Sequence, residues 1–189
     1  MRGVKHRRSD RAALPSKVVH MRTISSPTAP WVKMRLRIIM LVIAVLVFAG
    51  DRVTKALVEE RIPDHAVIPI LPGCFNLTNT KNTGAAFGMF SESPAAWKTA
   101  VLVVVSVVLL VSVVGIVWRT GRLHWATSVG LACILGGALS NLYDRIRMGQ
   151  VVDFLDFYLR TYHWATFNLA DSSIVVGAGI LVAQVIFSE

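Results

Sequence analysis

Charged residues are scarce in this sequence: they make up 16% of its 189 residues, whereas 54% are hydrophobic. Soluble domains carry about 25% charged residues, so the deficit argues against a soluble chain and favours one that faces lipid. Cysteine is also rare, since Cys74 and Cys133 are the only two, and a disulfide framework needs more. We therefore assign neither cysteine a role.

The sequence also lacks the motifs on which several hydrolase classes depend. It contains no HExxH zinc motif, no GxSxG nucleophile motif and no cluster of cysteine and histidine. We therefore expect no metal and no cofactor. The groups left for chemistry are carboxylates, and two close carboxylates can share one proton. One can then activate water while the protonated one polarises a carbonyl group, which hydrolyses a peptide without a covalent intermediate.

The formal net charge of +9 is concentrated at one end of the chain. Half of the 20 lysines and arginines lie in residues 1–37, and in the remainder basic and acidic residues balance. This distribution indicates a topology signal rather than a nucleic-acid partner. Residues 1–33 are basic and show no apolar period, so we predict a disordered extension. Met34 offers an alternative start for the domain 34–189.

Four apolar stretches follow, each close to the roughly 20 residues that span a bilayer. They are approximately residues 38–57, 97–118, 125–143 and 169–187. We predict an all-α membrane protein with four transmembrane helices in a phospholipid bilayer. The first stretch is not read as a signal peptide, because Gly50-Asp51-Arg52 is no small-residue cleavage site and three more spans follow.

The distribution of basic residues predicts the orientation. The N-terminus is basic and the short loop 118–124 contains arginines, so we place the N-terminus and this loop on the cytoplasmic side. With four spans, the C-terminus then also lies inside. Loops 58–96 and 143–168 then face outward, although three arginines in the second weaken this bias. Alternating apolar residues and turn formers in 66–90, and the strand-like run 151–157, predict a small extracytoplasmic β-layer.

Several polar residues converge at one depth near the outer surface. With a rise of about 1.5 Å per residue, Asp51 lies roughly 20 Å and Asn141 roughly 24 Å from the cytoplasmic face. Asp171 begins the last helix from the outside. The members of this layer are Asp51, Lys55, Asn141, Asp144, Arg145 and Asp171. Ionisable groups at such a depth usually face a bundle interior and mark function.

Each of these residues could also have a purely structural role. Asp51 and Lys55, spaced i, i+4, could form a neutralising ion pair on one helical face. Asp144 and Arg145 could cap the third helix. The helix dipole could hold Asp171 in a purely capping role.

The remaining candidate residues also have structural alternatives to a functional role. Asp153 and Asp156 could be ordinary solvated carboxylates of a loop. Asn168 could cap the last helix. No histidine has an evident nucleophile partner in the sequence. The residues alone therefore lead to a membrane protein with a candidate carboxylate site.

Five motifs resemble the signature blocks of the lipoprotein signal peptidases (signal peptidase II), in the family's order and from about residue 38 onward. They are Asp51-Arg-Val-Thr-Lys55, Asn82-Thr-Gly-Ala-Ala-Phe87, Gly136-Gly-Ala-Leu-Ser-Asn141-Leu-Tyr-Asp144-Arg145, Val151-Val-Asp153-Phe154 and Phe167-Asn168-Leu-Ala-Asp171. The sequence departs from the family at Ser140, where glycine is expected. The extension 1–33 also has no counterpart in the family's core.

The resemblance implies an aspartic endopeptidase of the bacterial inner membrane whose site faces the extracytoplasmic side. Its substrates would be prolipoproteins, cut just before a cysteine that carries a diacylglyceryl group. The implied catalytic residues are Asp153 and Asp171. The implied substrate-binding residues are Asn82, Asn141, Arg145 and Asn168. The implied supporting residues are Asp51, Lys55, Gly136, Asp144 and Ala170.

Two other classes compete with this interpretation. A small transporter or assembly factor should bury charges near the middle of the membrane, often with repeats, whereas here the charges gather near one surface. Another intramembrane aspartic peptidase would place both acids inside spans, whereas Asp153 falls in a loop.

Overall fold

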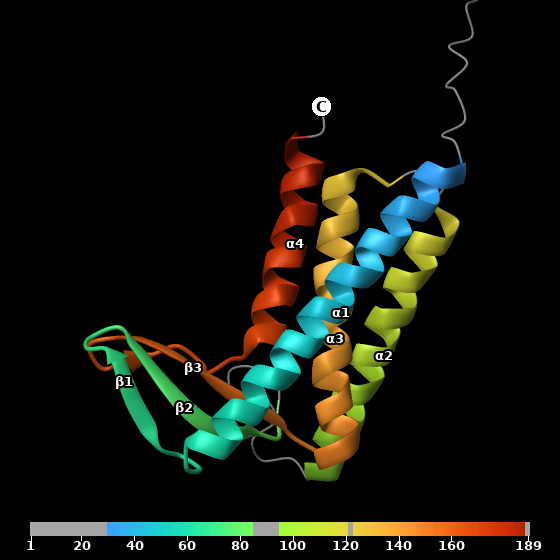
Figure 1. Cartoon of the computed structure of the whole chain (residues 1–189). Coiled ribbons are helices and arrows are strands. Elements are labelled where there is room, and N and C mark those ends of the chain that lie inside the picture. The colour runs from blue at the N-terminus through green and yellow to red at the C-terminus, as the bar shows by residue number, and fades with distance from the viewer. Residues whose placement is uncertain (1–29, 85–94, 121–122, 188–189) are drawn as a thin grey trace, which may run out of the picture.

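The computed structural model describes residues 30–84, 95–120 and 123–187. Long helices form a bundle, and a small sheet lies at the end of the bundle opposite to the end of the last helix (Figure 1). The order of elements is α1 (Pro30–Arg61), β1 (Val67–Leu71), β2 (Phe75–Asn82), α2 (Ala95–Arg119), α3 (Trp125–Met148), β3 (Val151–Leu159), β4 (Tyr162–His163) and α4 (Leu169–Phe187).

The helices lie where the apolar stretches predict them, with changed ends. The bounds of α4 agree with the prediction, whereas α3 continues five residues beyond the predicted end at 143 to Met148. α1 begins at Pro30, so the last four residues of the predicted extension 1–33 are helical. Residues 1–29 lie outside the described residues.

Within the described residues, three helices are long and apolar enough to cross a membrane: Thr99–Arg119 of α2, Trp125–Met148 and Leu169–Phe187. The predicted count of four is therefore not confirmed. α1 falls short because Arg37 and Asp51 bound its uninterrupted apolar stretch.

α3 is the central helix, because it packs against α1, α2 and α4. Close contact depends on glycine on both sides of it. A Cβ added at Gly136 would lie 2.6 Å from the carbonyl oxygen of Ala44 in α1, and one at Gly137 would clash with the carbonyl oxygen of Ala170 in α4. Small residues permit such backbone approach between membrane helices. The polar side chains at the end of α3 are thereby held between α1 and α4.

The sheet is antiparallel, in the order β1-β2-β3-β4. α3 ends at Gly149, whose backbone is left-handed (φ 70°) and whose N–H donates to the carbonyl oxygen of Arg145 (3.0 Å). β3 then pairs with β2, which places Asn82 opposite Val151 and Thr80 opposite Asp153. The predicted β-layer is therefore present, although residues 85–90 of its first part lie outside the described residues.

The sheet is anchored on the end of α1. Val58 and Ile62 of α1 pack with Val152 and Phe154 of β3 in a buried apolar cluster. This contact joins the two segments that carry polar residues, α1 and β3, at the same end of the bundle as the start of α4 (Figure 1).

Candidate active site

The start of α4 holds one carboxylate in a fixed orientation. Asn168 is the N-cap, and its Oδ1 accepts the backbone N–H of Asp171 (2.9 Å). Asp171 Oδ2 in turn accepts the backbone N–H of Asn168 (3.3 Å). This reciprocal arrangement is a capping box, and it confirms the predicted cap. The helix dipole favours the ionised form of a carboxylate at this place.

β3 brings a second carboxylate to the same place. Asp153 is 1% exposed. Its Oδ2 accepts the side-chain amide of Asn82 (2.8 Å) and its Oδ1 that of Asn168 (2.7 Å). Asn168 therefore hydrogen-bonds both carboxylates, through its side chain to Asp153 and through its backbone to Asp171. One residue therefore binds both an acid of strand β3 and an acid at the start of α4.

The electrostatic surroundings favour a proton on this pair. Burial and, to a smaller extent, the negative charge of Asp171 raise the pKa of Asp153 from 3.8 to about 7. The amides of Asn82 and Asn168 oppose this shift because they stabilise the ionised form. Asp153 is therefore about half protonated near neutral pH, beside the carboxylate of Asp171.

A cavity of about 580 Å³ opens over the two carboxylates. Its polar lining includes Asn82, Arg145, Asp153 and Asp171. Its apolar lining comprises Val151, Trp164, Ala165, Phe167, Ile174, Val175 and Val176. The site therefore combines a polar floor with walls that suit a lipid-like or apolar ligand. Within the described residues, no group of three or more histidine, cysteine or acidic side chains is arranged to hold a metal ion.

The four predicted substrate-binding residues occupy two different positions. Asn82 and Arg145 line the cavity. Asn141 and Asn168 are buried behind the carboxylates. Asn141 donates its amide to Asp171 Oδ1 (2.7 Å) and accepts the ammonium of Lys55 (3.0 Å).

Behind Asn141 lies a cluster of buried charges. Lys55 Nζ contacts Asp51 Oδ2 (2.6 Å), Asp144 Oδ2 (2.7 Å) and Asn141 Oδ1 (3.0 Å), so all three of its N–H donors have acceptors. Asp144 Oδ1 accepts the guanidinium of Arg52. Two acids and two bases make the cluster neutral, as buried charges require. The predicted ion pair of Asp51 and Lys55 is confirmed.

The alternative in which Asp144 and Arg145 only cap the third helix does not match the structure. Both residues lie inside α3, and Asp144 is fully buried against Arg52 and Lys55 of α1. Arg145 donates instead to the carbonyl oxygen of Asn141, one turn back (3.4 Å). Arg52 has no acidic residue three or four positions away on its own helix, so no local spacing in the sequence signals this ion pair.

Asp51 connects the ion cluster to α4. Its Oδ1 accepts the backbone N–H of Ala170 (2.8 Å), and its Oδ2 accepts the hydroxyl of Ser140 (2.7 Å). Ser140, the departure from the family's pattern, is thus a hydrogen-bond donor to a buried carboxylate. The predicted supporting residue Ala170 contributes its backbone and lies next to Asp171.

The alternative that Asp156 is a solvated loop carboxylate does not match the structure either. It lies in β3, is 5% exposed, and accepts the side-chain amide of Asn76 (2.8 Å), its cross-strand partner. Asp156 Oδ1 also lies 2.9 Å from Nδ1 of His163, so this histidine does have a carboxylate partner. Asp156 does not line the cavity. It stabilises the sheet.

The fold and the site together define a helical membrane protein with two carboxylates that line one apolar-walled cavity and bind the same asparagine. A family model described as "Signal peptidase (SPase) II" matches residues 43–187. The chain belongs to the signal peptidase II family. Membership of this family implies that the chain is a protease.

Named relatives and solved structures agree with this assignment. The lipoprotein signal peptidase of Solibacter usitatus is 42% identical over 144 residues, which are 76% of this chain and 88% of that protein. That of Desulforapulum autotrophicum is 46% identical over 151 residues, 78% of this chain and 91% of its own length. A solved structure of a bacterial membrane enzyme matches with a TM-score of 0.69 and 27% identity, over 79% of this chain and 94% of that one.

Proposed function

We propose that this chain is an aspartic endopeptidase that removes signal peptides from diacylglyceryl-modified prolipoproteins, cutting just before the modified cysteine. Asp153 and Asp171 form its catalytic dyad. The observation that carries this proposal is the pair of hydrogen bonds from Asn168, which hold both carboxylates at the floor of one cavity. The names of the relatives support the choice of substrate.

The proposed chemistry needs one proton on the dyad. Asp153, whose pKa is about 7, holds it and donates a hydrogen bond to the scissile carbonyl oxygen. Asp171, at the positive end of the α4 dipole, takes a proton from water, and the water oxygen bonds to the carbonyl carbon. The carbonyl oxygen receives the proton of Asp153, which gives a neutral gem-diol.

Collapse of the gem-diol returns Asp153 to its protonated form and Asp171 to its ionised form. Asp171 gives its proton to the amide nitrogen as the C–N bond breaks, and one hydroxyl proton of the diol returns to Asp153 as the new carboxyl group forms. No covalent enzyme intermediate arises. Arg145 and Asn82 line the cavity and supply hydrogen-bond donors for the substrate's carbonyl oxygens.

We infer that α1 is the fourth span and that both termini are cytoplasmic in the bacterial inner membrane. The 32 residues of α1 correspond to roughly 48 Å of helix, which is more than a bilayer core needs. Its polar residues Asp51 and Lys55 are buried against α3 rather than exposed to lipid. The cavity and the sheet then face the extracytoplasmic side.

Cleavage of a purified diacylglyceryl preprotein in detergent tests the proposal. Asp153→Asn and Asp171→Asn should each lower turnover by at least about 10³-fold, and the double variant should be scarcely slower, because members of a catalytic unit are not additive. Asp156→Asn is the matched control, since it alters the same strand outside the cavity, and it should stay active. Near wild-type turnover of folded Asp153→Asn would overturn the mechanism.

A further inference from the structure

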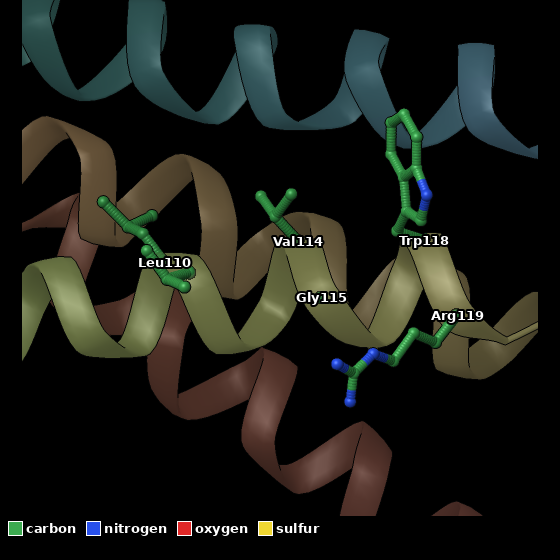
Figure 2. Close-up of a pocket in the computed structure, with 6 residues that line it drawn as sticks. Leu110, Val114, Gly115, Trp118 and Arg119 are labelled. Atoms are coloured by element: carbon green, nitrogen blue, oxygen red, sulfur yellow. The ribbon is translucent and has the colours of Figure 1, made fainter.

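A second cavity lies on the surface of α2, far from the carboxylates. It has a volume of about 410 Å³ and is lined by Leu110, Val111, Val114, Gly115, Trp118 and Arg119. These residues form two adjacent rows with i, i+4 spacing along the helix. Figure 2 shows Val114 and Trp118 on one side of α2 and Arg119 on the other, with Gly115 between them. The groove spans roughly 14 Å along the helix axis.

No neighbouring helix within the described residues fills the space above Gly115. An added Cβ there would meet no atom within 4 Å. At Gly130, Gly137 and Gly177, by contrast, an added Cβ would press against backbone atoms of the facing helix. Gly115 is therefore not explained by packing inside this part of the chain, and the opening is available to an external ligand.

The groove is apolar along its length and cationic at one end. Arg119, in the last turn of α2, has no hydrogen-bond or ion-pair partner within the described residues. The first part of α1, which contains Arg35 and Arg37, lies at the same end of the bundle as the end of α2 (Figure 1). The acidic residues that the structure describes all lie in the opposite half of the bundle or in the sheet and its loops. An unpaired cation at the end of an apolar groove suits an amphiphile with an anionic head.

We propose that this groove binds an anionic phospholipid. One acyl chain lies along α2 over Gly115, and the phosphate accepts hydrogen bonds from the guanidinium of Arg119. The exposed indole of Trp118 lies at the same level as the head group, where membrane proteins concentrate tryptophan. The site is independent of the peptidase proposal because it shares no residue with the cavity over Asp153.

Native mass spectrometry of the full chain with phosphatidylglycerol or phosphatidylcholine tests this site. The wild-type protein should retain one phosphatidylglycerol after the other lipids dissociate, and retain phosphatidylcholine about tenfold less. Gly115→Leu, which fills the groove, and Arg119→Gln, which removes the charge, should each lower phosphatidylglycerol retention about tenfold. Gly179→Leu is the matched control: Gly179 is an equally open glycine, on α4, and its variant should behave as wild type.

Two outcomes would overturn the proposal. Equal retention of both lipids by all four proteins would mean that only unspecific boundary lipid covers α2. Cysteine cross-linking between copies at Val111 that Gly115→Leu abolishes would assign the groove to a second copy of the chain. Arg119→Gln alters an exposed side chain, so this arm remains decisive even where the leucine variants lower the yield of folded protein.

Discussion

Replacing Asp153 by asparagine should stabilise the folded protein at alkaline pH while it abolishes turnover. The carboxylate is 1% exposed and carries a pKa of about 7, so above this pH the fold must hold a poorly solvated negative charge near Asp171. The asparagine side chain has nearly the same shape and never ionises. The ionised side chain of Asp153, the residue proposed for catalysis, therefore lowers the free energy of unfolding.

The magnitude follows from the pKa. A change from 3.8 to about 7, at about 1.4 kcal/mol per tenfold change in an equilibrium, corresponds to roughly 4 kcal/mol. Because folding raises this pKa, the stability that Asp153 contributes is complete below pH 3.8 and is lost as the pH rises through about 7. The stability of Asp153→Asn relative to wild type should therefore increase by about 2–3 kcal/mol between pH 5 and pH 8.

The change with pH is the informative quantity, rather than the absolute difference. An asparagine oxygen can serve only one of the two amides, of Asn82 and Asn168, that now bind Asp153, and this pH-independent loss costs about 1–3 kcal/mol. Unfolding of purified protein in detergent, followed at pH 5, 6, 7 and 8, separates the two effects. Asp64→Asn, at an exposed carboxylate, should show little change with pH. A pH-independent difference for Asp153→Asn would refute the reasoning.

Three further predictions follow from the same contacts. In wild-type enzyme, kcat/KM for a lipidated preprotein should fall about tenfold per pH unit above pH 7, as Asp153 loses its proton; a flat profile up to pH 9 contradicts this. Gly137→Val should lower the free energy of unfolding by more than about 3 kcal/mol, whereas Gly179→Val, in open space, should lower it by under about 1 kcal/mol. Equal losses in the two variants would contradict the packing argument. Asp144→Asn should destabilise by about 3–5 kcal/mol, because Lys55 keeps its buried charge with one partner fewer, and unchanged unfolding would disprove the cluster's role.

The parts of the fold that depend on local pattern could be predicted from the sequence. Apolar length identified α2, α3 and α4. The i, i+4 spacing identified the ion pair of Asp51 and Lys55, and the cap at Asn168 follows from its place before an apolar run. Each of these features needs only neighbours within a few residues along the chain.

The parts that depend on contacts between distant segments could not be predicted. Arg52 meets Asp144 across 92 residues, and no local spacing signals this pair. Asp156 is buried because strand pairing sets it against Asn76, 80 residues away. α3 continues past its apolar stretch because the charge of Asp144 is neutralised from α1, so this charged residue does not end the helix.

Asp51 and Lys55 of α1 stabilise the start of another helix, α4. Asp51 accepts the N–H of Ala170 in the first turn of α4, a group that a helix cannot satisfy within itself. Lys55 and Ser140 fix that carboxylate from the other side. An apolar residue at 51 would leave the amide of Ala170 unpaired and would free the adjacent turn that orients Asp171. The buried cluster therefore acts on the proposed dyad by fixing the helix start, without touching the cavity.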